Sequence, residues 1–344
     1  MDCGSGLLLL LTRSIRAVEP GTTLLVHTAE PSVPPDLVEW AALAGHTVVS
    51  SASDAPTGPW HVLVRRGGGA PLSATGSVFS TGAAAPVGQR LWLYTNFHCN
   101  LACSYCCSAS SPRADARLLP VSVALQAADQ FAALGGRELV LTGGEPFLHP
   151  QLGELVLGLA ERLPVTLLTN AMVFARGPRR ATLESLPRHR VTLQVSLDSA
   201  EPALHDRHRG PGSHARAVRG IDLARALGFR VRVAATLHDP TADAVAALDA
   251  LLDGMRVAAE DRLVRPVAAQ GAAEHGQHVS IDTLAPEPTL AVDGLWWHPV
   301  GVTDPAMRVA DAPLPIAAGL DTIRDTLAVR SAAHEQGRTV FRCV

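Results

Sequence analysis

Residues 91–107 read LWLYTNFHCNLACSYCC, an apolar run followed at once by a loop that is dense in cysteine. The apolar run is typical of a buried β-strand. Cys99, Cys103 and Cys106 then follow within one short loop. Thiolates are the soft ligands that hold iron–sulfur clusters, and cysteines spaced this closely direct several sulfurs at one cubane. Three ligands for four irons leave one iron open, as a catalytic metal centre requires.

Two other interpretations of this loop stay open at the level of the sequence. A zinc ion bound by the three thiolates would need a fourth ligand, which His98 or Cys107 could supply. The thiols could also be buried without any ligand. Cys107 does not fit the three-cysteine pattern, so it either points away into the fold or lies beside the cluster or the substrate.

Beyond the loop, short apolar runs alternate with longer segments of helical period. This order predicts parallel strands joined by crossover helices. The fold class is therefore α/β, with a partial (β/α)6 TIM-like barrel whose chemistry gathers at the carboxyl ends of the strands. The predicted strands are residues 91–94, 138–141, 165–168, 191–196, 231–235 and 262–265, and the predicted helices are residues 121–134, 152–162, 181–186, 215–227 and 242–255.

Upstream of the loop, residues 67–88 are rich in Gly, Ala, Ser and Pro and have no period, which is typical of a flexible linker. Before them, helix-like segments alternate with strand-like runs at residues 23–27, 47–50 and 61–65, which predicts a small two-layer α/β sandwich. The chain is therefore divided into a small N-terminal domain (1–66), a linker (67–89), a barrel core (90–270) and a C-terminal extension (271–344).

Composition narrows the possible functions. The 344 residues include 32 acidic and 29 basic side chains, and every basic one is Arg because the chain contains no Lys. A net charge of −3 gives no electrostatic case for binding nucleic acid or an anionic membrane. The missing lysine excludes a pyridoxal-phosphate Schiff base and a P-loop phosphate site. Clustered cysteines, no signal peptide and no apolar run of about 20 residues predict a reducing, cytoplasmic location.

The cysteine spacing, with Tyr105 before the third thiol, resembles the signature of the radical S-adenosylmethionine (radical SAM) enzymes. The resemblance covers residues 90 to about 270. A second motif of that family, GGEP, which binds the methionine amino group of SAM, is matched after the second barrel strand by Gly143, Gly144, Glu145 and Pro146. Glycines bring the backbone close to a ligand, and a carboxylate complements an ammonium group.

Two further matches stand at the next two strand ends. Asn170 follows Thr169 where the family often has TNG, although Ala171 replaces the glycine. Ser196 and Asp198 close the fourth strand and resemble the SxD element, which places a hydroxyl near the carboxylate or the ribose of SAM.

Residues 205–210, HDRHRG, resemble the HDxxRG segment of the peptide-modifying and cofactor-maturing branch. Arg209 would offer a two-pronged donor to a carboxylate, and an exposed, ion-paired Arg is the alternative. Because the chain has no Lys, Ser196 and Arg209 are the candidates to meet the carboxylate of SAM.

The resemblance implies a reaction, two cofactors and a partner. A [4Fe–4S] cluster on Cys99, Cys103 and Cys106 would bind SAM and cleave it reductively, giving a 5′-deoxyadenosyl radical that abstracts hydrogen from a small-molecule or peptide substrate. An electron donor such as flavodoxin or ferredoxin would supply the electron. The protein would position the reactants and exclude water. The alternatives are a peptide or metabolite maturase whose N-terminal domain only recruits substrate, and a non-catalytic iron–sulfur or zinc protein.

Residues 1–66 resemble the TusA-like sulfur carriers, whose single cysteine near the start of the first helix carries a persulfide. Cys3 stands at that place, where a helix N-terminus favours a thiolate. The family's CPxP is replaced by CGSG at residues 3–6, and the strand that usually precedes the cysteine is absent. This resemblance implies sulfur transfer or sulfur-linked biosynthesis, with a cysteine desulfurase as sulfur donor. The alternative is a former carrier that serves only for docking.

Residues 290–300, LAVDGLWWHPV, resemble the hairpin in the SPASM or twitch extensions of radical SAM enzymes. A cysteine there normally binds an auxiliary cluster, but His298 stands near that place and the tail contains only Cys343, which is too few thiols for such a cluster. Trp296, Trp297 and His298 either line a substrate pocket or pack a hairpin core. Cys343 is a candidate reactive thiol, hydrogen-atom donor or lone ligand.

Overall fold

The computed structural model describes residues 89–336 apart from 238–240 and 282, and parts of residues 11–67. Cys3, Cys343 and almost all of the predicted linker lie outside the described residues. The chain forms two units, a small one that contains the first three strands and a larger one that includes Pro86–Leu327. Within residues 11–67 the undescribed positions are 13, 16–17, 20, 29–32, 35–36, 38–39, 42–43 and 54–59.

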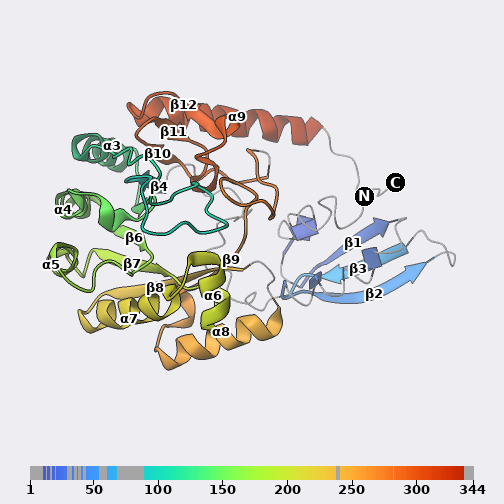
Figure 1. Ribbon diagram of the computed structural model, residues 1–344. Helices are drawn as coiled ribbons and strands as arrows, with labels where there is room; N and C mark the ends of the chain where they lie inside the picture. The colour runs from blue at the N-terminus through green and yellow to red at the C-terminus, as the bar shows by residue number, and fades with distance from the viewer. Residues whose placement is uncertain are drawn as a thin grey trace. The chain divides into compact units, whose positions relative to one another are not determined.

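Six parallel strands form the centre of the larger unit, and helices surround them (Figure 1). Each strand pairs with the next one along the chain. The strands are β4 (Arg90–Tyr94), β5 (Glu138–Thr142), β6 (Val165–Thr169), β7 (Val191–Ser196), β8 (Arg230–Leu237) and β9 (Arg262–Pro266). The helices of this unit are α3 (Val121–Ala133), α4 (Leu152–Arg162), α5 (Pro178–Ser185), α6 (Pro202–Arg209), α7 (Ser213–Ala226), α8 (Ala242–Gly254) and the start of α9 (Ile316–Gln336).

Alternate residues of the strands hold the helices to the sheet. Leu91 and Leu93 of β4 are fully buried in one continuous core with Leu155 and Leu159 of α4. Full burial of such a side chain contributes roughly 1.5–3 kcal/mol. In the described residues the outermost strands of the sheet, β9 and β12, do not pair with each other, so the barrel is open. The predicted α/β fold with a partial TIM-like barrel is confirmed.

The helix α6 was not predicted. Its sequence, PALHDRHR, is short and polar, and His205 is the one residue of this helix that is buried, so it has no apolar stripe to give a period. Proline at the first helical position favours its start. Gly210 ends the helix with a φ of 105°, a conformation that favours glycine.

The C-terminal extension adds a hairpin to the sheet. Strands β10 (Thr289–Ala291) and β11 (Gly294–Trp296) pair with each other, β10 also pairs with β4, and β12 (Arg308–Ala310) follows β11. Trp296, Trp297 and His298 are all buried. Trp297 donates from Nε1 to the carbonyl oxygen of Leu284 at 3.0 Å. These side chains therefore pack the extension, and the alternative of an open pocket lined by them does not hold.

The small unit is a three-stranded antiparallel sheet in the order β1-β3-β2, formed by β1 (Thr23–Thr28), β2 (Thr47–Ser53) and β3 (Trp60–Arg65). All three strands fall where the sequence predicted them. Helical residues of the same unit pack on the sheet, as expected for one helical layer on one sheet. The shared core consists of Leu11, Ile15, Val33, Leu37, Ala41, Val26, Val62 and Val64.

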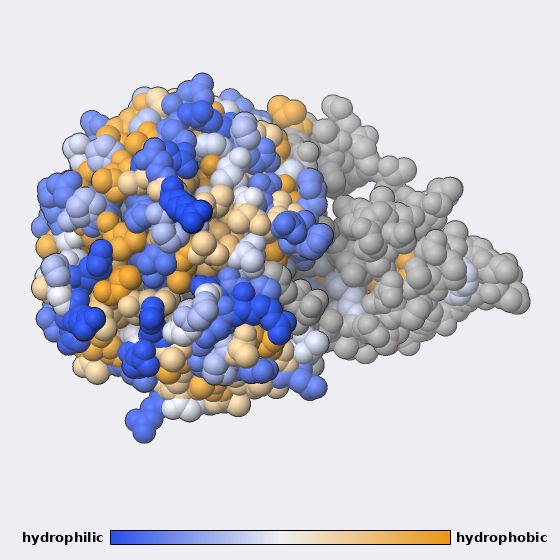
Figure 2. Space-filling model, viewed as in Figure 1, coloured by the Kyte–Doolittle hydropathy of each residue, from blue (hydrophilic) through white to orange (hydrophobic). Residues whose placement is uncertain are grey.

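The surface of the larger unit is mixed. On the face drawn in Figure 2, hydrophilic and hydrophobic residues are interspersed. Its exposed large apolar side chains, such as Leu134, Leu157 and Leu204, are scattered along the chain, as is normal for single surface residues. Among the helices that the structure describes, none combines the length and the apolar character needed to cross a membrane.

In the turn after β6, Ala171 stands where the family pattern has a glycine, and Gly220 on a neighbouring helix makes room for it. Ala171 adopts a φ of 58°, the left-handed conformation that glycine takes more easily, at a cost of roughly 1–2 kcal/mol. Gly220 of α7 lies directly against it, and a Cβ at position 220 would overlap the carbonyl oxygen of Ala171. The missing glycine of the turn is thus matched by a glycine on the neighbouring helix.

Replacing Gly220 with Ala should therefore destabilise the protein by about 1–3 kcal/mol, because the added methyl group must displace the turn. Chemical denaturation followed by circular dichroism measures the change. Gly254→Ala is the matched control, since open space surrounds Gly254 at the end of α8 and alanine favours helix. Equal stability of the two variants would contradict this account.

Candidate active site at the strand ends

The predicted site residues all follow the carboxyl ends of barrel strands. The cysteine loop follows β4, Gly143 and Glu145 follow β5, and Asn170 follows β6. Ser196 is the last residue of β7, and Asp198 stands two residues after it. Because neighbouring parallel strands end at the same edge of a sheet, the fold brings these segments together.

The cysteine loop holds four free thiols, the three predicted cluster ligands Cys99, Cys103 and Cys106 and their neighbour Cys107. The Sγ of Cys99 accepts a hydrogen bond from the backbone N–H of Leu101 at 3.4 Å, and the Sγ of Cys106 accepts one from Ser110 at 3.3 Å. Burial, with the nearby Glu145, raises the pKa of Cys99 to about 12. Burial raises the pKa of Cys103 to about 11, against the lowering effect of the Arg209 guanidinium.

These thiols fit a cluster better than a single ion. The negative charges of Cys103 and Cys106 both act to raise the pKa of Cys99, so the three thiols lie within electrostatic range of one another. In the part of the chain that the structure describes, no three Cys, His, Asp or Glu side chains form a group that could hold one metal ion. A cubane spreads its thiolates over different irons, whereas zinc draws its ligands to one centre. Backbone N–H groups directed at sulfur also favour the thiolate that such a cluster needs.

Cys107 faces a different neighbour. Its thiol forms a hydrogen bond with Tyr94, and burial, with the adjacent Cys106, raises its pKa to about 12. Tyr94 is buried and donates from its hydroxyl to the carbonyl oxygen of Pro299 at 2.7 Å. Cys107 thus points into the fold, which is one of the two placements that the sequence left open.

The glycines of the GGEP motif are required by packing within the protein. A Cβ on Gly143 would meet the backbone oxygen of Asn96, and one on Gly144 would overlap that of His98. The N–H groups of Gly144 and Glu145 donate to these same oxygens at 2.9 and 3.0 Å. The two glycines therefore let the β5 loop lie flat against the chain that leads into Cys99.

Glu145 joins the loop after β5 to the end of β6. Its fully buried carboxylate accepts hydrogen bonds from the N–H of Phe147, the hydroxyl of Thr169 and the N–H of Asn170, at 2.8–3.1 Å. Burial raises the pKa of Glu145 to about 7, although each of these donors lowers it. A carboxylate offers about four acceptor positions, so one stays available for a further donor. Pro146 is buried at the start of the short 3₁₀ helix Pro146–Leu148.

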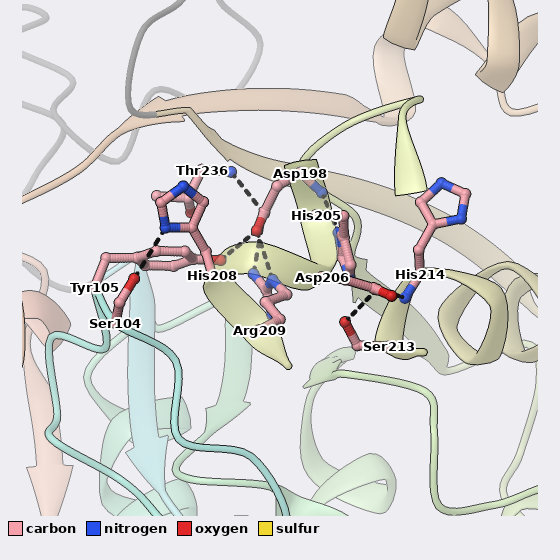
Figure 3. Close-up of polar contacts among 10 residues, drawn as sticks. All are labelled: Ser104, Tyr105, Asp198, His205, Asp206, His208, Arg209, Ser213, His214 and Thr236. Atoms are coloured by element: carbon pink, nitrogen blue, oxygen red, sulfur yellow. Dashed lines mark hydrogen bonds and ion pairs between the residues drawn. The ribbon is translucent and has the colours of Figure 1, made fainter. Parts of the chain in front are cut away.

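Asp198 is the centre of a buried polar network (Figure 3). Arg209 donates to it from Nε at 2.6 Å and from Nη2 at 3.1 Å, and the N–H of Thr236 donates at 3.0 Å. The hydroxyl of Tyr105, in the cysteine loop, also donates to this carboxylate. Burial would raise the pKa of Asp198, but these donors, Arg209 above all, hold it below its usual value.

Arg209 therefore has a partner within the protein. Its side chain is only 10% exposed and forms an ion pair with Asp198. The alternative of an exposed, ion-paired arginine is therefore wrong about the exposure and right about the ion pair. The guanidinium also lies over the ring of Tyr105, with 5.4 Å to the ring centroid. Ser196 is partly exposed at the end of β7.

The segment HDRHRG holds neighbouring segments together through hydrogen bonds. Most of these hydrogen bonds were not predicted from the sequence. His205 accepts a hydrogen bond at Nδ1 from the N–H of Asp198, at 3.1 Å. His208 bonds through Nδ1 to the hydroxyl of Ser104 in the cysteine loop, at 3.0 Å. Asp206 accepts the N–H groups of residues 212 and 214 at the start of α7. One short helix thus ties the cysteine loop to β7 and α7 (Figure 3).

The C-terminal extension fixes the other end of the cysteine loop. The N–H of Ala272 donates to the carbonyl oxygen of Cys106 at 2.9 Å, and the hydroxyl of Thr303 donates to that of Cys107 at 3.1 Å. Gly271 has a φ of 64°, and a Cβ there would overlap the carbonyl oxygens of both cysteines. Gly271 therefore positions the loop, and no sequence motif marked it.

Gly271→Ala should displace the cysteine loop at a cost of roughly 1–3 kcal/mol, which is a loss of roughly 5-fold to 150-fold in affinity for iron. Iron and sulfide content after anaerobic reconstitution measures the effect. The matched control is Gly177→Ala, because Gly177 has a similar φ of 70° but lies in open space. If both variants take up iron as wild type does, Gly271 does not position the loop.

The chain was compared with known proteins. Residues 93–249 match the Radical SAM superfamily. An AdoMet-dependent heme synthase from Methanosarcina barkeri (strain Fusaro / DSM 804) is 32% identical over 145 residues, which are 40% of this chain and 40% of that protein. The antilisterial bacteriocin subtilosin biosynthesis protein AlbA from Bacillus subtilis (strain 168) is 33% identical over 147 residues, 41% of this chain and 31% of that protein.

A solved structure, native anSMEcpe with bound AdoMet, has the same fold, with a TM-score of 0.54 at 12% identity over 69% of this chain and 82% of that one. The chain spans less than half the length of the two curated relatives. The matched residues include the cysteine loop and the ends of strands β5–β8. Residues 93–249 are therefore a domain of the radical SAM superfamily, whose enzymes use a [4Fe–4S] cluster and S-adenosylmethionine.

Proposed function

We propose that this protein is a radical SAM enzyme in which Cys99, Cys103 and Cys106 bind the [4Fe–4S] cluster. The observation that carries the proposal is the cysteine loop itself, whose three thiols lie at the open strand ends and which is anchored on both sides, by His208 and by Ala272. Rigid anchoring suits this role because a radical reacts with almost any nearby carbon–hydrogen bond.

When bound, the cluster and SAM supply an electron and a 5′-deoxyadenosyl radical that takes a hydrogen atom from the substrate. The chain's own residues bind and orient. The backbone N–H groups of Leu101 and Ser110 stabilise thiolate charge at Cys99 and Cys106. A reducing compartment such as the cytoplasm would keep these thiols free, and a flavodoxin or ferredoxin would deliver the electron.

The SAM contacts are assigned by position. Glu145 and the backbone at Gly143 and Gly144 would meet the methionine amino group, since the carboxylate of Glu145 keeps one acceptor position. Asn170 and Ser196 end the next strands and would face the rest of SAM. Tyr105, Pro146, Asp198 and Arg209 would shape the pocket from the protein side, because their polar atoms already bond one another or their chains are buried.

Replacing any one of the three cluster cysteines with Ala should abolish formation of 5′-deoxyadenosine from SAM and dithionite. Cys107→Ala is the matched control, because its thiol faces Tyr94, and it should keep both cluster and cleavage. Chromatography of the product and electron paramagnetic resonance of the reduced cluster measure the two effects. An essential Cys107 and a dispensable Cys99 would refute the ligand assignment. A spectrum that SAM leaves unchanged, with no 5′-deoxyadenosine, would favour a non-catalytic iron–sulfur protein.

For the small unit we propose a TusA-like domain in which Cys3 carries sulfur supplied by a cysteine desulfurase. The support is the sequence resemblance together with the helical layer on the three-stranded sheet. Cys3→Ala should abolish persulfide at this position, seen by mass spectrometry after incubation with a persulfide donor, and should stop turnover. Full activity of this variant would remove the sulfur step.

A second candidate is a peptide or metabolite maturase whose small unit only recruits substrate, with a degenerate SPASM-like extension. The observation that favours it is the match to a bacteriocin biosynthesis protein and to an anSMEcpe structure with AdoMet and a bound peptide, at a TM-score of 0.53. Deleting residues 1–66 separates the two candidates, because recruitment alone leaves turnover of a small substrate intact. Cys343, which lies outside the described residues, stays a candidate reactive thiol, hydrogen-atom donor or lone ligand in both candidates.

A further inference from the structure

Arg265 is a cation without a hydrogen-bonding partner for its buried nitrogen. It stands near the end of β9, where it pairs in register with Thr236 of β8. The side chain as a whole is partly exposed, yet its Nε is buried and has no hydrogen bond to any described residue. Buried polar atoms are nearly always bonded, and a charged one costs more than a neutral one when it is not.

The one carboxylate that acts on Arg265, that of Glu287, is bonded elsewhere, and so is the nearby Glu138 that shares its partner Arg90. Glu287 accepts from the indole N–H of Trp92 at 2.9 Å and pairs with Arg90 at 3.6 Å. Glu138 pairs with the same Arg90 at 3.3 Å and accepts from a threonine hydroxyl at 2.7 Å. Arg90 thus engages both carboxylates, and neither makes an ion pair with Arg265.

A second arginine makes the environment more positive. Burial above all, together with the charges of Arg232 and Arg90, lowers the pKa of Arg265 to about 10, while Cys107 and Glu287 oppose this shift. Arg232 lines a cavity of about 350 Å³ at the amino ends of the strands, together with Glu138 and Glu260. Water and carboxylates can therefore solvate Arg232. Arg265 lies one residue before the end of β9 and is not among the residues that line this cavity.

The position of Arg265 is next to the candidate active site. Thr236, its register neighbour, donates from its N–H to Asp198, the centre of the polar network. Seven residues after Arg265 the chain reaches Ala272, which bonds the carbonyl oxygen of Cys106. Arg265 is therefore in register with a residue that bonds the Asp198 network, and Cys107 of the cysteine loop lies within electrostatic range of it.

We propose that Arg265 binds an oxyanion of the substrate, a carboxylate or a phosphate group, inside the barrel beside the cysteine loop. The inference rests on the proposed function for its meaning, because it names the chemical class of the substrate for that site. A guanidinium presents its donors as a planar fork that matches both kinds of oxyanion. In a chain without Lys, arginine is also the one side chain that carries a positive charge at every physiological pH.

The test uses the cluster-reconstituted full chain with SAM bound. Unfolding temperature is measured with increasing inorganic phosphate, succinate, or neutral succinamide, at constant ionic strength. Phosphate or succinate should stabilise the wild type, and succinamide should not. Arg265→Gln should weaken the anion response by roughly tenfold or more, because a charged hydrogen-bonded contact is lost. Without any anion this variant should unfold at a higher temperature than wild type, because the unpaired buried charge is gone.

Arg219→Gln is the matched control, since Arg219 is an exposed arginine on α7, and it should respond to anions as wild type does. An unchanged response of Arg265→Gln, or no response of the wild type to either anion, overturns the proposal. If Arg265→Gln does not fold, Arg265→Lys keeps the charge but loses the fork. An anion response weaker than that of wild type then supports the proposal, and an equal one overturns it.

Failure of the anion site and failure of the proposed radical chemistry remain distinguishable. Formation of 5′-deoxyadenosine is scored separately in the same preparations, without substrate. An Arg265-dependent anion response without 5′-deoxyadenosine would leave the site standing and refute the chemistry. Cleavage of SAM without any anion response would refute the anion site and leave the proposed radical chemistry standing.

Discussion

The ion pair between Asp198 and Arg209 holds the centre of this molecule together. One buried carboxylate receives four hydrogen bonds, from the cysteine loop, from α6 and from β8, so three distant segments of the chain meet at one charge. Taking such a pair out of water costs several kcal/mol, and only nearly complete hydrogen bonding offsets that cost. Removing one partner alone would leave the other charge buried. The pair thus fixes the cysteine loop more firmly than the loop's own short sequence could.

The positions of the strands and the order of the motifs could be predicted from the sequence, because apolar runs and cysteine spacing are local patterns. The contacts between motifs were not. Tyr105 and Asp198 are 93 residues apart, and nothing in either motif says that they bond. α6 gave no signal because a polar helix of eight residues has no periodic apolar face. Gly143 and Gly144 were predicted to bring the backbone close to a ligand, whereas the close approach in this structure is to the backbone at Asn96 and His98, which no motif indicated.

The absence of Lys gives the electrostatics of the barrel a particular form. Its cations are arginines, whose guanidinium groups are rigid and planar, and two of them pair with carboxylates: Arg209 with Asp198, and Arg90 with Glu138 and Glu287. Arginine keeps its charge when buried, so a guanidinium group without a carboxylate partner cannot become neutral as a lysine could. The buried Nε of Arg265 has no hydrogen bond to a described residue, and this is the charge that we propose a ligand pairs with.

The anchoring of the cysteine loop also bears on the order in which the protein matures. Thr303 bonds Cys107 across 196 residues of sequence. While the ribosome is still adding the extension, the loop therefore has its first anchor within reach, at His208, but not its last. Iron delivery to the nascent barrel would meet a loop that is held at one end.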